Sequence, residues 1–226
     1  MRELDHDRVE TAVRQAEAGS RGEIVVVVSG EVSRYREVPL IWGTAAALLI
    51  PPIAFAAGLQ PLDLAALGGG WEVAHQAAVK AQVSLAVVVY TTLQVIVFAL
   101  VTWLVAIPQV RRVLTPRFLK RRRVGRSAET QFAAIAARAM GSDTGVLIFI
   151  APVEHQVEIM ADASIHQKVG NPLWEKAAQA VKGGMQRGDP TGGVVEAVTL
   201  CGEAMREHFP ATGENPDYLP NRPVEI

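Results

Sequence analysis

Two long uncharged stretches constrain the fold of this chain more than any other feature of its sequence. They run from Val38 to Leu59 and from Val83 to Ile107, and neither contains Asp, Glu, Lys, Arg or His. At about 1.5 Å of rise per helical residue, each exceeds the roughly 30 Å of bilayer hydrocarbon. The sequence therefore predicts a transmembrane hairpin over residues 38–107.

The first stretch carries Pro51 and Pro52 near its middle. Two adjacent prolines remove two amide donors, which is expected to kink or interrupt a helix. The segment either spans the membrane fully or enters it as a broken element, and the sequence leaves both alternatives open. A transporter is the weaker hypothesis, because neither stretch offers an intramembrane charge as a pathway for an ion.

A basic run follows the second stretch, although the formal net charge of the chain is only -1. Residues 107–126 hold eight basic side chains and no acidic one, whereas residues 60–82 hold only Lys80 against Asp63 and Glu72. Nucleic-acid binding would explain such a run, but stacking aromatics beyond Phe118 and a recognisable motif are missing. The positive-inside rule instead predicts a multi-pass protein of the inner (plasma) membrane with both termini in the cytoplasm. Six basic residues are expected to lie along anionic lipid headgroups: Arg117, Lys120, Arg121, Arg122, Arg123 and Arg126.

The segments on either side of the hairpin have the pattern of a globular α/β domain. Before it come an amphipathic helix from Leu4 to Ala16 and a strand, "EIVVVV", whose unbroken β-branched run indicates burial on both faces. After it come a helix capped at Ser127, a strand hairpin, "GVLIFIA" with "HQVEIMA", a helix opening at Asn171 and a last helix from Val194 to His208. One strand alone cannot bury two faces. We therefore expect one cytoplasmic domain interrupted by the hairpin.

The expected organisation follows from these elements. Its parts are residues 1–37 (first part of the domain), 38–107 (transmembrane hairpin), 108–126 (basic juxtamembrane linker), 127–210 (second part of the domain) and 211–226 (flexible tail). The single cysteine, Cys201, cannot form an internal disulfide, and it is expected on the buried face of the last helix.

Three segments together resemble the TPM domain family. They are "GEIVVVVSG", "DTGVLIFIAPVEHQVEIMAD" and "RGDPTGGVVEAV", which are similar to the family's first strand, its hairpin and the turn that opens its last helix. The arrangement resembles a bacterial membrane-protein branch in which two helices interrupt the domain. The resemblance implies a mixed β-sheet flanked by helices. It also implies envelope partners, such as a second TPM protein or a LemA-type protein, in a homo- or hetero-oligomer.

A phosphatase activity or metal binding has been proposed for some members of this family. The loop that is "GYGLE"-like in the family is "DASIH" here, from Asp162 to His166, so both glycines and the acid are replaced. Asp143, Asp162, His166 and Asp189 are candidates to converge at one edge of the sheet and hold a divalent cation such as calcium. The alternative is that Asp143 and Asp189 serve as turn residues and that Asp162 and His166 are solvated loop side chains.

Two functional hypotheses remain. The first is a membrane-anchored, non-enzymatic interaction or assembly module at the bacterial cell envelope, with no nucleic-acid partner. The second is a metal-dependent phosphatase with an acidic site at the sheet edge.

Overall fold

A computed structural model shows two compact units along the chain. It describes residues 4–33, 35–58, 72–138, 145–211 and 219–226. The first unit combines residues 1–34 with residues 117–226, and the second comprises residues 35–116. The domain is thus assembled from both ends of the sequence, with one continuous insertion between them.

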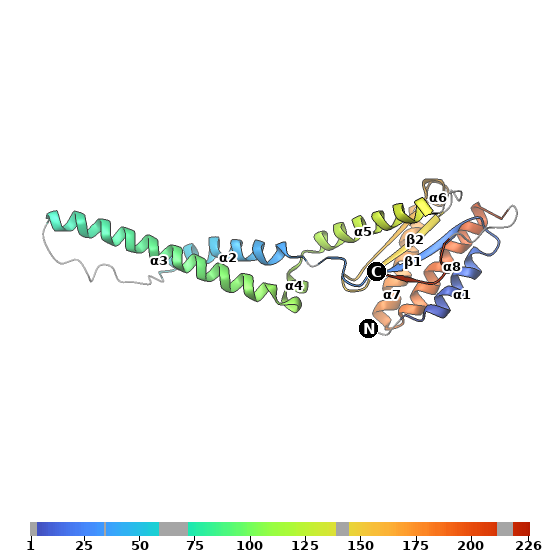
Figure 1. The fold of residues 1–226 in the computed structure, drawn as a ribbon, viewed down its shortest axis with the longest axis horizontal. Coiled ribbons are helices and arrows are strands. Elements are labelled where there is room, and N and C mark those ends of the chain that lie inside the picture. Colours follow the sequence, from blue (N-terminus) through green and yellow to red (C-terminus); the bar gives the residue numbers. More distant parts are fainter. Residues whose placement is uncertain (1–3, 34, 59–71, 139–144, 212–218) are drawn as a thin grey trace. The chain divides into compact units, whose positions relative to one another are not determined.

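The first unit is built on a four-stranded mixed sheet with the strand order β3-β2-β1-β4 (Figure 1). The strands are β1 (Glu23–Val28), β2 (Gly145–Ala151), β3 (Gln156–Ala161) and β4 (Val224–Glu225). β1 pairs in parallel with β2 and with β4, while β2 and β3 form an antiparallel hairpin. The expected mixed sheet is confirmed. β1 is the central strand that the later segment lacked.

Helices cover both faces of this sheet (Figure 1). They are α1 (His6–Glu17), α5 (Arg117–Arg138), α6 (Ala163–Val169), α7 (Asn171–Arg187) and α8 (Pro190–His208). Successive strand residues face opposite sides. Ile24, Val26 and Ile148 therefore pack with α1, α7 and α8, while Val25 and Leu147 pack with α5.

The basic segment differs from the expected linker. Residues 117–126 form the first half of α5, so Ser127 lies inside this helix and is not its N-cap. Val124 and Ala128 are fully buried against the sheet, with Phe132 and Ile135 further along the same face. The basic side chains are therefore carried by a helix of the domain.

The C-terminal segment also departs from the expected flexible tail. Val224 and Glu225 form β4 beside β1, and the amide of Ile226 donates to the carbonyl of Val28 at 3.0 Å. Leu219 is buried with the α5 side of the core. The end of the chain thus completes the sheet.

The second unit is a helical hairpin. It consists of α2 (Glu37–Ala56), α3 (Glu72–Ala106) and the short α4 (Pro108–Leu114). α2 continues through Pro51 and Pro52, so the expected interruption of the helix is absent. By length and composition, Glu37–Ala56 and Ala86–Ala106 could each cross a membrane.

Close contact between α2 and α3 depends on a small residue. A Cβ at Gly43 would overlap Thr102 Oγ1 and lie 3.2 Å from the carbonyl oxygen of Phe98. Gln94 Nε2 donates to the carbonyl of Ala47 at 3.3 Å, and the rings of Phe55 and Tyr90 lie 5.8 Å apart. Small residues and interhelical hydrogen bonds of this kind are typical of helix pairs in membranes.

Candidate functional site

The predicted metal ligands at the end of β3 have structural partners. Asp162 Oδ2 accepts a hydrogen bond from the amide of Gly145 at 2.5 Å, which ties the end of β3 to the start of β2. His166 lies on α6, one turn beyond Asp162, and its amide donates to the Asp162 carbonyl at 2.9 Å. His166 is exposed. Asp162 therefore directly precedes a short helix and His166 lies within it, whereas the sequence predicted a loop.

Asp189 is the N-cap of α8. Its Oδ1 accepts from the amide of Gly192 at 2.9 Å, which satisfies one of the free amides in the first turn. Gly188 has a left-handed conformation (φ 77°) and ends α7, and Pro190 occupies the first turn of α8. The order of residues in "RGDP" is thus what a tight helix-to-helix turn requires.

The glycines that follow this turn have a packing role. A Cβ at Gly193 would lie 2.7 Å from the Ala180 carbonyl oxygen, and one at Gly184 would lie 2.6 Å from Gly193 Cα. α7 and α8 approach closely because neither glycine has a side chain. The segment "RGDPTGG", which resembles the family signature, therefore forms the turn and allows α7 and α8 to pack closely.

The four predicted ligands are not brought together as a set. Asp143 falls outside the described residues. Within the part of the chain that the structure describes, no three His, Cys, Asp or Glu side chains form a group that could hold a metal ion. The calcium site stays a prediction.

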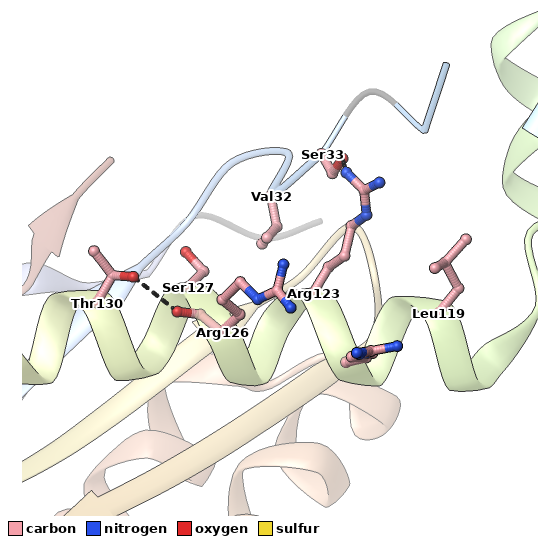
Figure 2. Close-up of a pocket in the computed structure, with 8 residues that line it drawn as sticks. Val32, Ser33, Leu119, Arg123, Arg126, Ser127 and Thr130 are labelled. Carbon is pink, nitrogen blue, oxygen red and sulfur yellow. Dashed lines mark hydrogen bonds between the residues drawn. The ribbon is translucent and has the colours of Figure 1, made fainter. Parts of the chain in front are cut away.

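A cavity lies between the segment after β1 and the exposed side of α5 (Figure 2). Its volume is about 590 Å³. Eight residues line it: Val32, Ser33, Leu119, Arg122, Arg123, Arg126, Ser127 and Thr130. We call this the arginine cavity. Three of the six basic residues that the sequence assigned to lipid headgroups thus line one surface cavity.

The arginine cavity has a defined polar wall. Arg123 Nη1 donates to Ser33 Oγ at 2.5 Å, which links α5 to the segment after β1, and Figure 2 shows these side chains side by side. Thr130 Oγ1 donates to the Arg126 carbonyl at 2.9 Å, drawn as the dashed line. Among the described residues, the side chains of Arg122 and Arg126 make no hydrogen bond or ion pair.

Sequence reasoning did not identify the five other described residues that line this cavity: Val32, Ser33, Leu119, Ser127 and Thr130. Ser127 and Thr130 follow Arg123 at spacings of four and seven, so a helix beginning at Arg117 would have placed them on its face. Val32 and Ser33 come from the other end of the sequence and gave no such signal. The pairing of β1 with β2 brings the segment after β1 close to α5.

A second, smaller cavity lies beside the outer strand β3, opposite α7. Its volume is about 370 Å³, and its lining includes Gln156 and Glu158 of β3 together with Trp174, Glu175 and Gln179 of α7. We call this the β3 groove. The indole Nε1 of Trp174 is itself buried, and it has no hydrogen-bond partner among the described residues.

Comparisons with known proteins identify a domain and a fold. Residues 108–204 match the family model described as the TPM domain. No curated protein matches the chain. Among solved structures, it is similar to the NMR structure of the BA42 protein from the psychrophilic bacterium Bizionia argentinensis, with a TM-score of 0.52 and 15% sequence identity. That similarity covers 100% of this chain and 98% of the BA42 chain. At this identity the likeness concerns the fold.

Proposed function

We propose that this chain, whose residues 108–204 match the TPM domain, is a membrane-anchored TPM-domain protein acting as a non-enzymatic interaction or assembly module at the bacterial cell envelope. The observation that carries this proposal is the surface of the helical hairpin. α2 and α3 direct large apolar side chains outward, whereas the TPM domain encloses its own apolar residues on both faces of a sheet.

The outward side chains are numerous on both helices. Those exposed by half or more include Leu40, Ile41, Leu48, Leu49 and Ile53 on α2 and Val87, Val88, Val95 and Leu100 on α3. Exposed apolar surface of this kind is unfavourable in water and favourable in lipid hydrocarbon. Trp103, which is 70% exposed, lies near the end of α3, where indole rings favour the membrane interface.

The charge pattern supports an orientation for this anchor. Arg111 and Arg112 on α4 follow α3 directly, and the basic residues of α5 come next. With positive residues on the cytoplasmic side, both termini and the TPM domain lie in the cytoplasm. In this orientation Arg117, Lys120 and Arg121 lie near anionic lipid headgroups, each contributing about 1 kcal/mol at the membrane surface.

The β3 groove supports the interaction role. β3 is an outer strand of the sheet, and the edge of such a strand can pair with a segment of another protein. We propose that an envelope protein, a second TPM protein or a LemA-type protein, docks here. The metal-dependent phosphatase has no specific observation in its favour among the described residues.

Membrane anchoring and orientation are tested by thiol labelling in intact cells. Single cysteines replace Gly69, between α2 and α3, and Lys176, on the exposed side of α7. An impermeant thiol reagent should label position 69 alone, and position 176 only after lysis. The protein should also stay in the membrane pellet at alkaline pH. Labelling at position 176 in intact cells, or release from the pellet, contradicts the proposal.

The interaction role is tested by photo-cross-linking in cells. A cross-linking residue at Gln179, in the β3 groove, should capture an envelope protein that mass spectrometry identifies, and Glu175→Arg should prevent its capture. The same residue at Glu203, exposed on α8, is the matched control. Equal capture at both positions, or capture unaffected by Glu175→Arg, contradicts the proposed docking site.

A further inference from the structure

The arginine cavity concentrates positive charge in one open hollow on the surface of the domain. Arg122, Arg123 and Arg126 line it, and the described residues of its lining include no Asp or Glu. Arg122 and Arg126 are four residues apart on α5, where like charges destabilise a helix by about 0.2–0.5 kcal/mol per pair. A bound anion would remove this repulsion.

The three arginines differ in how they are held. Arg123 is fixed by its bond to Ser33 Oγ, and its Nη1 is thereby used. Among the described residues, the guanidinium groups of Arg122 and Arg126 are not engaged by any hydrogen bond or ion pair. Each guanidinium presents a planar fork of donors that matches the oxygens of a phosphate. The two guanidinium forks and the third, positioned charge thus line the cavity from α5.

The remaining lining adds one more donor and an apolar boundary. Ser127 contributes a hydroxyl from α5, which can donate to an anionic oxygen. The Thr130 hydroxyl already donates to the Arg126 carbonyl, so it offers only lone pairs to a ligand. Val32 and Leu119 supply apolar surface, which suits the organic part of a ligand better than a bare inorganic ion.

We propose that the arginine cavity is a binding site for a phosphate monoester. Near neutral pH this group carries between about -1.5 and -2 charges and three strong acceptor oxygens, which the arginines and Ser127 complement. The phosphate belongs either to a lipid headgroup or to a soluble phosphate ester, and the chemistry of recognition is the same for both. The inference does not depend on the hairpin crossing a membrane, because every lining residue belongs to the TPM domain unit.

The test is calorimetric titration of the full-length protein in micelles of a neutral detergent at fixed ionic strength. One arm uses glycerol 3-phosphate, and the other uses a short-chain phosphatidic acid, whose headgroup is also a phosphate monoester. Saturable binding of both ligands supports a site for soluble phosphate esters. Binding of the lipid alone supports a headgroup site. Failure of both ligands to bind overturns the proposal.

A pair of charge-matched variants distinguishes binding in the cavity from nonspecific electrostatic attraction to the basic surface. Arg122→Gln with Arg126→Gln should weaken binding by at least about tenfold, since charge-assisted bonds are the strong ones. Lys176→Gln with Arg187→Gln removes the same charge from exposed positions on α7, outside the cavity and outside the residues assigned to lipid headgroups, and it should change the affinity by less than about twofold. Equal losses in the two double variants would show diffuse attraction and overturn the proposal.

A milder variant covers the case in which the double variant fails to fold. Arg126→Lys keeps the charge and loses the planar fork, so binding should weaken by roughly threefold while the far-ultraviolet spectrum stays unchanged. Unchanged affinity in Arg126→Lys, together with unchanged affinity in Ser127→Ala, would exclude directed contacts in the cavity.

Discussion

Glu154 Oε1 accepts a hydrogen bond from the backbone amide of Val32 at 3.2 Å, across 122 positions of sequence. Glu154 lies in the turn between β2 and β3 and is only 3% exposed, while Val32 lines the arginine cavity. This bond anchors one wall of the cavity to the β2–β3 turn. Burying a charged carboxylate costs free energy, because the carboxylate loses its hydration.

Glu154 is expected to make the stability of the domain depend on pH. Burial is the main cause that raises the pKa of this carboxyl above 4.5, and the charge of Glu31 adds to it, while the Val32 amide and Lys120 act in the opposite sense. A raised folded-state pKa means that the folded protein binds the proton more tightly than the unfolded chain. The contribution to stability is therefore full below about pH 4.5 and is lost as the pH rises through the folded pKa.

Glu154→Gln should remove this dependence while keeping an oxygen that can accept from Val32. Thermal unfolding of both proteins, followed by circular dichroism from about pH 4 to pH 8, measures the effect. The wild type should lose stability with rising pH relative to the variant. Glu203→Gln, on the exposed side of α8, is the control and should keep the wild-type slope. A Glu154→Gln slope equal to that of the wild type contradicts the expectation.

Gly184 should tolerate no side chain. Gly184→Ala places a methyl group 2.6 Å from Gly193 Cα and 2.7 Å from the Asp189 carbonyl oxygen, and both belong to the backbone. Forcing this overlap should cost about 1–3 kcal/mol of unfolding free energy, measured by denaturant titration.

The neighbouring glycine provides a matched control for this substitution. A Cβ at Gly183 meets only the mobile end of Arg187, whose Nη1 lies 3.0 Å away. Because alanine is the better helix former, Gly183→Ala should be neutral or stabilise by up to about 1 kcal/mol. A similar loss in both variants would mean that the α7–α8 distance does not depend on Gly184.

Periodicity in the sequence predicted the sheet and most of the helices that cover it. The unbroken run from Ile24 to Val28 identified a strand with two buried faces, and Val26 is indeed buried on one face while Val25 and Val27 are buried on the other. The pattern from Leu4 to Ala16 likewise gave α1. Such patterns depend only on residues near one another in the sequence, and the structure contains the strand and the helix that they predict.

Among the elements that the sequence analysis missed, the start of α5 and the strand β4 have signals that are weak or remote. The start of α5 was hidden by its charged residues, although Val124, Ala128, Phe132 and Ile135 repeat at helical spacing. β4 has only two residues and exists through its pairing with β1, which no local pattern encodes. The arginine cavity needs α5 and the segment after β1 together, so sequence alone could find only its cationic half.

Cys201 should be inert to thiol reagents in the folded protein. Its side chain is completely buried, as its position on α8 led us to expect, and burial raises the pKa of the thiol to about 12. Only the thiolate reacts, and it is scarce at neutral pH when the pKa is this high. Alkylation by iodoacetamide should therefore be slow in buffer and fast in denaturant. Rapid labelling of the native protein would contradict the buried position of Cys201.

Substitutions at Asp189 distinguish a helix cap from a metal ligand. As the N-cap of α8, Asp189 is replaceable by Asn, whose side-chain oxygen can also accept from Gly192. Asp189→Asn should therefore keep nearly the wild-type stability, whereas Asp189→Ala should lose about 1 kcal/mol of unfolding free energy. Denaturant unfolding with and without calcium measures both effects. Because an ion that binds only the folded state raises its stability, a calcium-dependent gain in the wild type that Asp189→Asn abolishes would identify Asp189 as a ligand. It would also revive the metal-dependent phosphatase hypothesis.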